Sequence, residues 1–187
     1  FKLWLMRRDD PRTKALIEQK KGGENARQAQ LQTQYNTPYT AVVKAWIGIF
    51  GAPCNAPPWG HLTAIDLKTR KVLWREVLGT ARDTGLFGSR LGVPLKTGVP
   101  NLGGSIITAG GLVFIGATTD QYLRAFDLRT GKVLWKARLP AGAQATPMTY
   151  RGRDGRQYVV ITAGGHGALG TRYGDYTMAF ALPPRSE

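Results

Sequence analysis

The sequence is short of cysteine, histidine and acidic residues: 187 residues include one Cys, two His and 12 Asp or Glu. A single cysteine, Cys54, excludes a framework of internal disulfides and a cysteine-based zinc site, and a small buried apolar residue is its expected role. No run reaches the roughly 18 apolar residues of a membrane-spanning helix. The opening residues, FKLWLMRR, are too short and wrongly flanked for a signal peptide.

The shortage of acids leaves a net charge of +14, with 26 Lys or Arg. The positive charge is spread along the chain, because no basic run is longer than two residues. A nucleic-acid surface normally clusters its basic residues, so this pattern disfavours nucleic acid as a partner. An anionic membrane surface or an acidic substrate agrees with the charge equally well.

Residues 1–58 differ in character from the rest. Asp10 and Pro11 predict a helix start, with Asp as the N-cap and Pro at the first helical position. Gly22 and Gly23 predict its end, and the polar residues 24–34 are compatible with helix or coil. We therefore expect 1–58 to be an irregular or helical insertion and connection.

A repeat dominates the remaining chain. LTAIDLKTRKVLW (62–74) returns as LRAFDLRTGKVLW (123–135), 61 residues later. A strand–turn–strand unit that recurs at a fixed spacing is typical of a radial or stacked β-array. One unit cannot bury its own apolar faces, so neighbouring units must cover them.

Residues 59–187 read as short strands separated by Gly- and Pro-containing turns. Residues 103–139 give one complete four-stranded antiparallel unit, and residues 144–182 give a last unit with three strands, whose fourth would come from the other end of the chain. The long connection 79–102 is expected to be either functional or disordered. The predicted fold is all-β, a partial β-propeller.

Several strings resemble the quinoprotein dehydrogenases, eight-bladed propellers with tryptophan-docking repeats. Residues 35–184 are similar to the membrane-bound glucose, quinate and shikimate branch of this family. Residues 1–34 show no such resemblance. The strings are GAPCNAPPWG (51–60), GVPNLGG (98–104), TAGGLVFIGATTDQYLRAFD (108–127), LPAGAQATPMTY (139–150) and AGGHGALGTRYGDYTMAFALP (163–183).

This resemblance implies the last two to three blades of a longer enzyme at the periplasmic face of the bacterial inner membrane. Such an enzyme oxidises a sugar or cyclic polyol with pyrroloquinoline quinone (PQQ) and passes electrons to ubiquinone. A Ca²⁺ or Mg²⁺ ion assists. The catalytic base, the metal ligands and the other blades are expected upstream, so no catalytic residue is assigned here and the isolated chain is expected to be inactive.

The resemblance also implies site residues. His166, flanked by glycines, is the main candidate for contact with substrate or cofactor, and Asp120 is a second; the alternatives are a loop histidine satisfied by backbone and an ordinary turn aspartate. Further cofactor contacts are expected from residues near the ends of strands: Asn101, Thr146, Gly164 and Gly165, with Gly103, Gly104 and Gln144 nearby.

The repeated Asp66, Asp127, Trp74 and Trp135 are interpreted as structural: Asp and Thr-Gly tighten a hairpin, and Trp fills the wedge between blades. Arg70 stands where the second copy has Gly131, which is a strain if φ is positive there. The alternative function is a non-enzymatic propeller that serves as a protein-interaction scaffold. The AGGHG string and the connection 79–102 favour the enzyme, because a scaffold needs neither.

Overall fold

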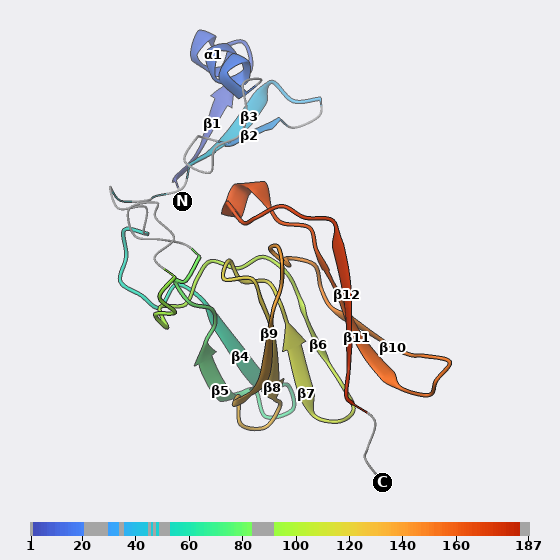
Figure 1. Cartoon of the computed structure of the whole chain (residues 1–187). Helices are drawn as coiled ribbons and strands as arrows, with labels where there is room; N and C mark the ends of the chain where they lie inside the picture. Colours follow the sequence, from blue (N-terminus) through green and yellow to red (C-terminus); the bar gives the residue numbers. More distant parts are fainter. Residues whose placement is uncertain are drawn as a thin grey trace.

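The computed structural model describes residues 2–20, 30–33, 36–44, 46, 48, 53–83 and 92–183. These residues form a small N-terminal unit and three consecutive antiparallel sheets, which lie next to one another in Figure 1. No helix in this part of the chain is long and apolar enough to cross a membrane.

The N-terminal unit contains more strand than we expected. Strands β1 (Lys2–Arg7), β2 (Gln30–Thr33) and β3 (Tyr39–Lys44) pair antiparallel in the order β1-β3-β2. The prediction of a helical or irregular segment is wrong for these strands. Residues 3–6 (Leu, Trp, Leu, Met) are all apolar, so the period-two alternation that identifies a strand is missing from the sequence of β1.

The predicted helix start is confirmed. Helix α1 spans Pro11–Lys20, and the Asp10 carboxylate accepts a hydrogen bond from the Arg12 amide at 2.8 Å. Asp10 is therefore the N-cap, as its position before proline predicts. Gly22 and Gly23, the predicted helix end, lie outside the described residues.

Cys54 is exposed, so the expectation of a small buried side chain is wrong. It lies between Pro53 and Pro57 in a connecting segment, and its backbone amide bonds to the Trp46 carbonyl at 3.4 Å. Connecting segments run over the surface because buried loops leave backbone groups without partners.

The three sheets are successive blades. The first unit has β4 (His61–Asp66) and β5 (Lys71–Val77). The middle blade is a four-stranded meander of β6 (Ser105–Ile107), β7 (Leu112–Ile115), β8 (Tyr122–Asp127) and β9 (Val133–Arg138). The last unit has β10 (Met148–Arg151), β11 (Gln157–Ala163), the 3-10 helix η2 (Gly167–Leu169) and β12 (Tyr176–Ala181). These sheets confirm the predicted all-β, partial propeller.

The sequence repeat is also a repeat of backbone geometry. The β4–β5 pairing shifts register between Ala64 and Ile65, and the β8–β9 pairing shifts between Ala125 and Phe126. These two irregularities are 61 residues apart, the spacing of the repeat. The same sequence therefore bends both ribbons at the same place.

The repeated aspartates close the two turns in the same way. Asp66 accepts hydrogen bonds from the amides of Lys68 and Thr69 at 2.8 and 3.2 Å. Asp127 accepts from the amides of Arg129 and Thr130 at 3.0 and 2.8 Å. Both carboxylates serve the turn, in agreement with the structural interpretation.

The repeated tryptophans join neighbouring units. The Trp74 indole N–H donates to the Leu128 carbonyl at 2.8 Å, and a Cβ added to Gly131 would lie 2.7 Å from the Trp74 ring. Trp135 makes an edge-to-face contact with Phe180 of the last unit, with ring centroids 5.3 Å apart. Each Trp thus packs against the following unit, as the wedge interpretation predicts.

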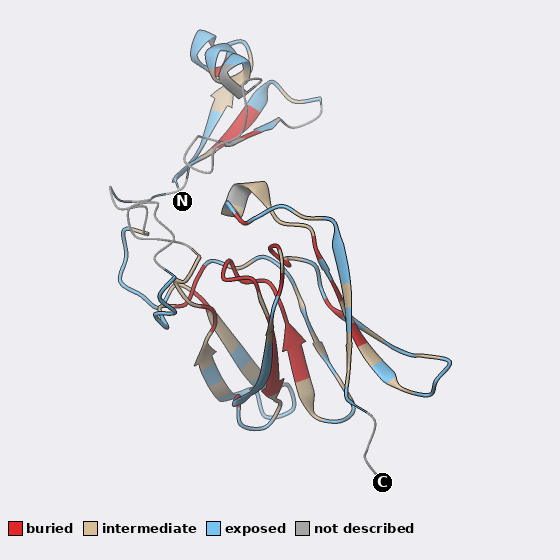
Figure 2. Ribbon diagram, in the orientation of Figure 1, coloured by how far each residue is buried: buried red, intermediate tan, exposed pale blue. Residues whose placement is uncertain are grey.

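The two central strands of the middle blade, β7 and β8, are largely buried (Figure 2), and a separate core lies on each side of them. Val113 and Ile115 of β7 point to the core shared with the first unit, while Phe114 between them points to the core shared with the last unit. Alternate side chains of a strand face opposite ways, so one strand supplies both cores.

Antiparallel strands place their connections alternately at two ends of the blades. The hairpin end holds the turns within each unit: 67–70, 108–111, 128–132 and 152–156. The loop end holds the connectors between units and the longer turns: 78–83, 92–104, 116–121, 139–147 and 164–175. Ligands of propellers bind where such loops converge, so we expect a ligand site at the loop end.

Candidate functional site

All the residues proposed for cofactor or substrate contact lie at the loop end. They come from the connector before β6, the turn before β8, the connector before β10 and the segment after β11. In chain order they are Asn101, Asp120, Thr146, Gly164, Gly165 and His166. Residues up to 65 positions apart in sequence therefore share one end of adjacent blades.

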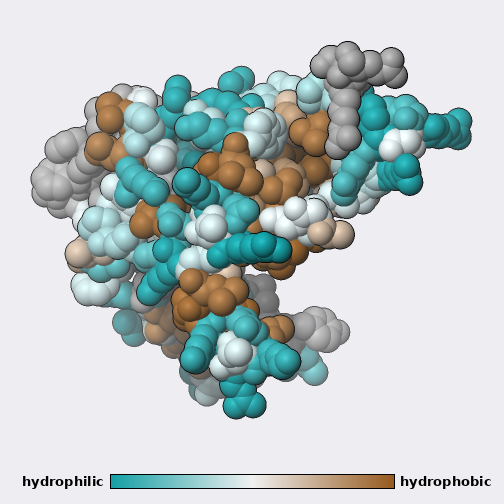
Figure 3. All heavy atoms as spheres, turned by 90° about the horizontal axis from the view of Figure 1, so that it is seen from below, coloured by the Kyte–Doolittle hydropathy of each residue, from teal (hydrophilic) through white to brown (hydrophobic). Residues whose placement is uncertain are grey.

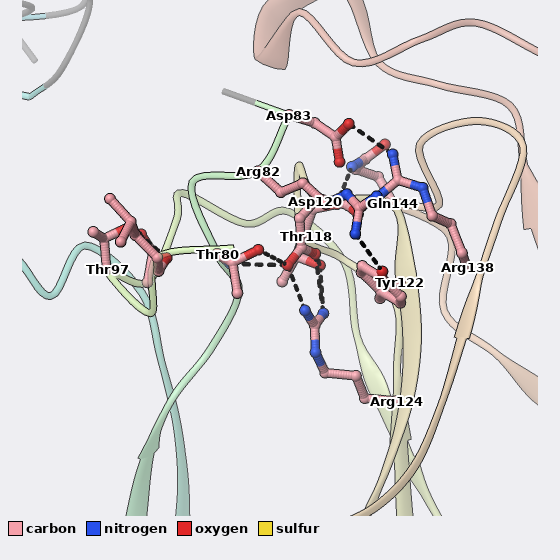
Figure 4. Close-up of polar contacts among 12 residues, drawn as sticks. Thr80, Arg82, Asp83, Thr97, Thr118, Asp120, Tyr122, Arg124, Arg138 and Gln144 are labelled. Carbon is pink, nitrogen blue, oxygen red and sulfur yellow. Dashed lines mark hydrogen bonds and ion pairs between the residues drawn. The ribbon is translucent and has the colours of Figure 1, made fainter. Parts of the chain in front are cut away.

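Asp120 is completely buried at this end (0% exposed). One carboxylate oxygen accepts from the amide and hydroxyl of Thr80, both at 2.8 Å. The other accepts from the Thr118 hydroxyl at 2.6 Å, and the Arg124 guanidinium pairs with both oxygens (Figure 4). The carboxylate therefore joins the first unit to the middle blade and already has protein donors at both oxygens.

The ionisation of Asp120 is decided by two opposing effects. Burial alone would raise its pKa, but hydrogen bonds and charge from Arg124, with the hydroxyls of Thr118 and Thr80, lower the pKa below its ordinary value. The carboxylate is thus ionised at neutral pH. A general base works best with a pKa near the operating pH, so Asp120 suits the role of an anchor and not that of a base.

Further contacts extend this junction towards the solvent. Arg82 donates to the Tyr122 hydroxyl at 3.2 Å, and Asp83 accepts from Arg138 at 2.7 Å. Arg138 also donates to the Asp120 carbonyl at 3.3 Å, and its guanidinium lies 5.3 Å from the centroid of the Tyr122 ring. Figure 4 shows these side chains converging on the turn that carries Asp120.

We call this set of contacts the polar seam. It joins three residues of the connector after β5 to three residues of the middle blade. The connector residues are Thr80, Arg82 and Asp83, and the blade residues are Asp120, Tyr122 and Arg138.

His166 lies at the junction between the middle blade and the last unit. It precedes η2, and its backbone amide donates to the Thr171 hydroxyl at 2.7 Å. That hydroxyl reaches the Gln144 side chain at 3.4 Å, and Gln144 reaches the Thr118 carbonyl at 3.5 Å. The histidine is therefore linked through two side chains to the turn that holds Asp120.

The two glycines before His166 have different surroundings. A Cβ on Gly165, where φ is +79°, would lie 2.4 Å from the Arg172 carbonyl oxygen. A Cβ on Gly164 would meet only the Gly174 carbonyl, at 3.8 Å. Gly165 is thus required by its own loop. Gly164 has free space where a side chain would lie, and its carbonyl accepts a hydrogen bond from the Gly174 amide at 3.2 Å.

Asn101 and Thr146 are held by local contacts. Asn101 bridges to Thr118 through the backbone, and its side chain donates to the Val99 carbonyl at 3.3 Å. The exposed Thr146 accepts a hydrogen bond from the Gly104 amide at 3.2 Å. Within the described residues no group of three or more His, Cys, Asp or Glu is placed to hold a metal ion.

Three side chains at the loop end each bury a polar atom that has no hydrogen-bond partner. They are Asp83 (Oδ2), Thr119 (Oγ1) and His166 (Nδ1), one from each unit. An unsatisfied buried group costs about 1–3 kcal/mol, so such groups are rare in native structures and are normally bound by water, an ion or a ligand. Their chemistry, a hydroxyl, an imidazole and a carboxylate, fits a ligand rich in oxygen atoms.

Comparison with known proteins identifies the family. Residues 1–159 match the family described as "PQQ: Glucose/ethanol/alcohol dehydrogenase, beta-propeller domain". The chain belongs to this PQQ propeller family. The match starts at residue 1 and so includes residues 1–34, where the sequence strings showed no likeness.

One protein similar to this chain is "Quinoprotein glucose dehydrogenase A" of Acinetobacter calcoaceticus. It is 53% identical to the chain over 154 residues (82% of this chain, 19% of that protein). The "Probable quinate dehydrogenase (quinone)" of Xanthomonas campestris pv. juglandis is 52% identical over 148 residues (79% and 19%). A solved structure, "Europium-containing methanol dehydrogenase", aligns with a TM-score of 0.47 at 27% identity (73% and 20%). The chain spans about a fifth of the length of these relatives.

Sequence reasoning missed most of the polar seam. Thr80, Arg82 and Asp83 lie in the connection 79–102 and Tyr122 lies in the string 108–127, but no pattern singles out these side chains or Arg138 individually. One signal was available: Asp83 lies 61 residues before Gln144, so the repeat places a polar residue at the same point of both connectors.

Proposed function

We propose that this chain is the C-terminal sector of a longer PQQ-dependent dehydrogenase that oxidises a hydroxyl group of a sugar or cyclic polyol. Membership of the PQQ propeller family supports the reaction class. The single observation that carries the proposal is His166 Nδ1, a buried and unpartnered nitrogen at the end where the loops of three blades gather.

The cofactor supplies the two-electron redox chemistry when bound, and the residues of this chain supply contacts and a dry environment. His166 and Gly164 would lie against cofactor or substrate, because His166 has an unpartnered ring nitrogen and Gly164 has free space where a side chain would lie. Thr119 would add a hydroxyl. Asp120 would hold the blades behind them, since both its oxygens are engaged by protein donors.

Other parts of the proposal concern the complete protein. The catalytic base and the ligands of a Ca²⁺ or Mg²⁺ ion would come from upstream blades. Electrons would pass to ubiquinone in the bacterial inner membrane, with the propeller at its periplasmic face. The resemblance to the membrane-bound glucose, quinate and shikimate branch is the basis for these assignments.

Kinetics of the complete enzyme test the proposal. With PQQ and Ca²⁺ it should oxidise D-glucose or quinate, whereas the isolated 187-residue chain should oxidise neither. His166→Ala should raise KM, or change the glucose-to-quinate preference, by roughly 10-fold, the effect of losing one hydrogen bond to a substrate.

His61→Ala is the matched control, because His61 belongs to β4 of the first unit, where its ring lies 3.3 Å from the Arg75 guanidinium, whereas His166 belongs to the last unit. It should leave the kinetics unchanged. Unaltered kinetics of His166→Ala with a lowered melting temperature would assign His166 a structural role, and turnover by the isolated chain would refute the sector proposal.

A further inference from the structure

The repeat provides an internal comparison for the polar seam. Residues 78–83 (LGTARD) follow β5, and residues 139–144 (LPAGAQ) follow β9, 61 positions later. Leu78 and Leu139 are both buried, at 1% and 2% exposure. The two connectors therefore start in the same way and cross corresponding blade junctions.

The junctions differ at the next positions. Thr80 and Arg82 of the first connector are matched by Ala141 and Ala143 in the second, and these alanines belong to the apolar core at 0% and 2% exposure. At these two positions the second junction thus has small apolar side chains, and the first has a hydroxyl and a guanidinium group.

This difference shows that the fold does not require a polar seam. A partly exposed ion pair such as Asp83–Arg138, with side chains 12% and 36% exposed, contributes little net stability. Apolar replacements of buried pairs with similar volume are often neutral or stabilising. A fold that closes one junction with alanine can close the other in the same way. The charged side chains of the first junction therefore need a reason other than blade packing.

The seam contacts are concentrated on one turn. Arg138 connects the Asp83 carboxylate to the Asp120 carbonyl, so a single guanidinium ties the connector to the backbone of the turn 118–121. Arg82 of the connector also donates to the hydroxyl of Tyr122, the first residue of β8 after the turn, at 3.2 Å. The turn carries Thr119, whose buried hydroxyl has no partner.

We propose that Asp83 and Arg138 are positioning residues for the loop-end ligand site. Their ion pair fixes the turn 118–121 against the connector and thereby sets the Thr119 hydroxyl for contact with bound PQQ. The proposal rests on the proposed function and adds to it a pair of residues that act through the turn and do not touch the cofactor.

The test uses the complete enzyme and measures PQQ affinity directly by equilibrium dialysis, with turnover as a second readout. The main variant is Asp83→Asn combined with Arg138→Met, which removes both charges together and leaves neither buried and unpaired. It should weaken PQQ binding roughly 10-fold or more, the usual effect of removing a residue that orients a ligating group. Its melting temperature should stay within a few degrees of the wild type.

Two further variants sharpen the result. Arg138→Lys should bind PQQ more weakly than the wild type but more tightly than the double variant. An ammonium can pair with Asp83 but lacks the planar fork that also reaches the Asp120 carbonyl. Lys96→Gln is the matched control: Lys96 pairs with Glu76 at 3.5 Å on the same connector, but its side chain is 67% exposed. It should leave PQQ affinity unchanged.

The outcomes separate the two proposals. Wild-type PQQ affinity in the double variant, with or without a lowered melting temperature, overturns the positioning role while the proposed function stands. A wild-type complete enzyme that fails to bind PQQ overturns the proposed function and the positioning role with it. Weaker binding in the double variant with a normal melting temperature supports both.

Discussion

Asp120 combines complete burial with a negative charge at neutral pH, so the loop end should be sensitive to its substitution. Its two oxygens receive donors from two blades, through Thr80 on one side and Thr118 and Arg124 on the other. Removing the negative charge leaves Arg124, itself 7% exposed, without its partner. Breaking a buried pair in this way costs about 3–5 kcal/mol.

We therefore expect Asp120→Asn to lower the free energy of unfolding by about 3–5 kcal/mol at pH 7. The folded pKa is lowered, so the stability from ionised Asp120 is present above the unfolded pKa of about 3.9 and is lost as the pH falls through the lower folded value. Urea unfolding of the complete protein at pH 7 and below pH 4 measures this.

The difference between variant and wild type should shrink at the lower pH. Asp127→Asn is the control, because the Asp127 carboxylate serves a hairpin turn and should give a smaller loss. An Asp120→Asn variant as stable as the wild type at pH 7 would contradict the anchor role.

At the scale of elements, the two repeated turns differ in one residue that bears on backbone strain. Arg70 has φ of +59° and Gly131 has φ of +72°. A non-glycine residue in the left-handed region costs roughly 1 kcal/mol, and glycine avoids this cost. The first turn therefore carries a strain that the second does not.

Arg70→Gly should raise the free energy of unfolding by about 0.5–1 kcal/mol, because the gain in the turn is partly offset by the greater freedom of glycine in the unfolded chain. Gly131→Ala should lower it by about 1–3 kcal/mol, since the added Cβ would lie 2.7 Å from the Trp74 ring in a left-handed turn. Thermal unfolding of the two variants measures both signs, and effects of equal sign would contradict the strain argument.

Sequence reasoning reached those elements that depend on local rules. The Asp10 cap, the turn aspartates and the docking tryptophans follow from residue type and spacing. The β1 strand was missed because its apolar residues do not alternate, and the seam was missed because the 40 residues between Thr80 and Asp120 hide their contact. Contacts across blade junctions depend on how units stack, which residue type alone does not encode.

At the scale of the whole molecule, the described blades form an open arc. The first unit pairs only β4 with β5, and the last sheet ends at β12. Large apolar side chains are exposed on both outer units, such as Ile65 (54%) and Val72 (60%) of the first, and Met148 (55%) and Tyr176 (43%) of the last. Figure 3 shows hydrophobic patches among hydrophilic side chains on the face seen from below.

Open strand edges and exposed apolar faces are surfaces for association. In the complete protein, the upstream blades we propose would cover them. The isolated 187-residue chain lacks that cover, so we expect it to self-associate in a concentration-dependent way. Sedimentation velocity over a range of concentrations measures this directly.

A single charge tests which surface is responsible. Ile65 pairs with Val72 across β4 and β5, so Ile65→Lys places an ammonium in the exposed apolar pair and should weaken self-association of the isolated chain several-fold. Ala109→Lys adds the same charge at an exposed hairpin tip of the middle blade, outside the apolar face of the first unit, and should have little effect. A monomeric wild-type chain, or equal effects of the two lysines, would show that the outer faces do not need neighbouring blades. In that event the three sheets would be a self-sufficient domain, and the exposed outer faces would no longer support the proposal of upstream blades.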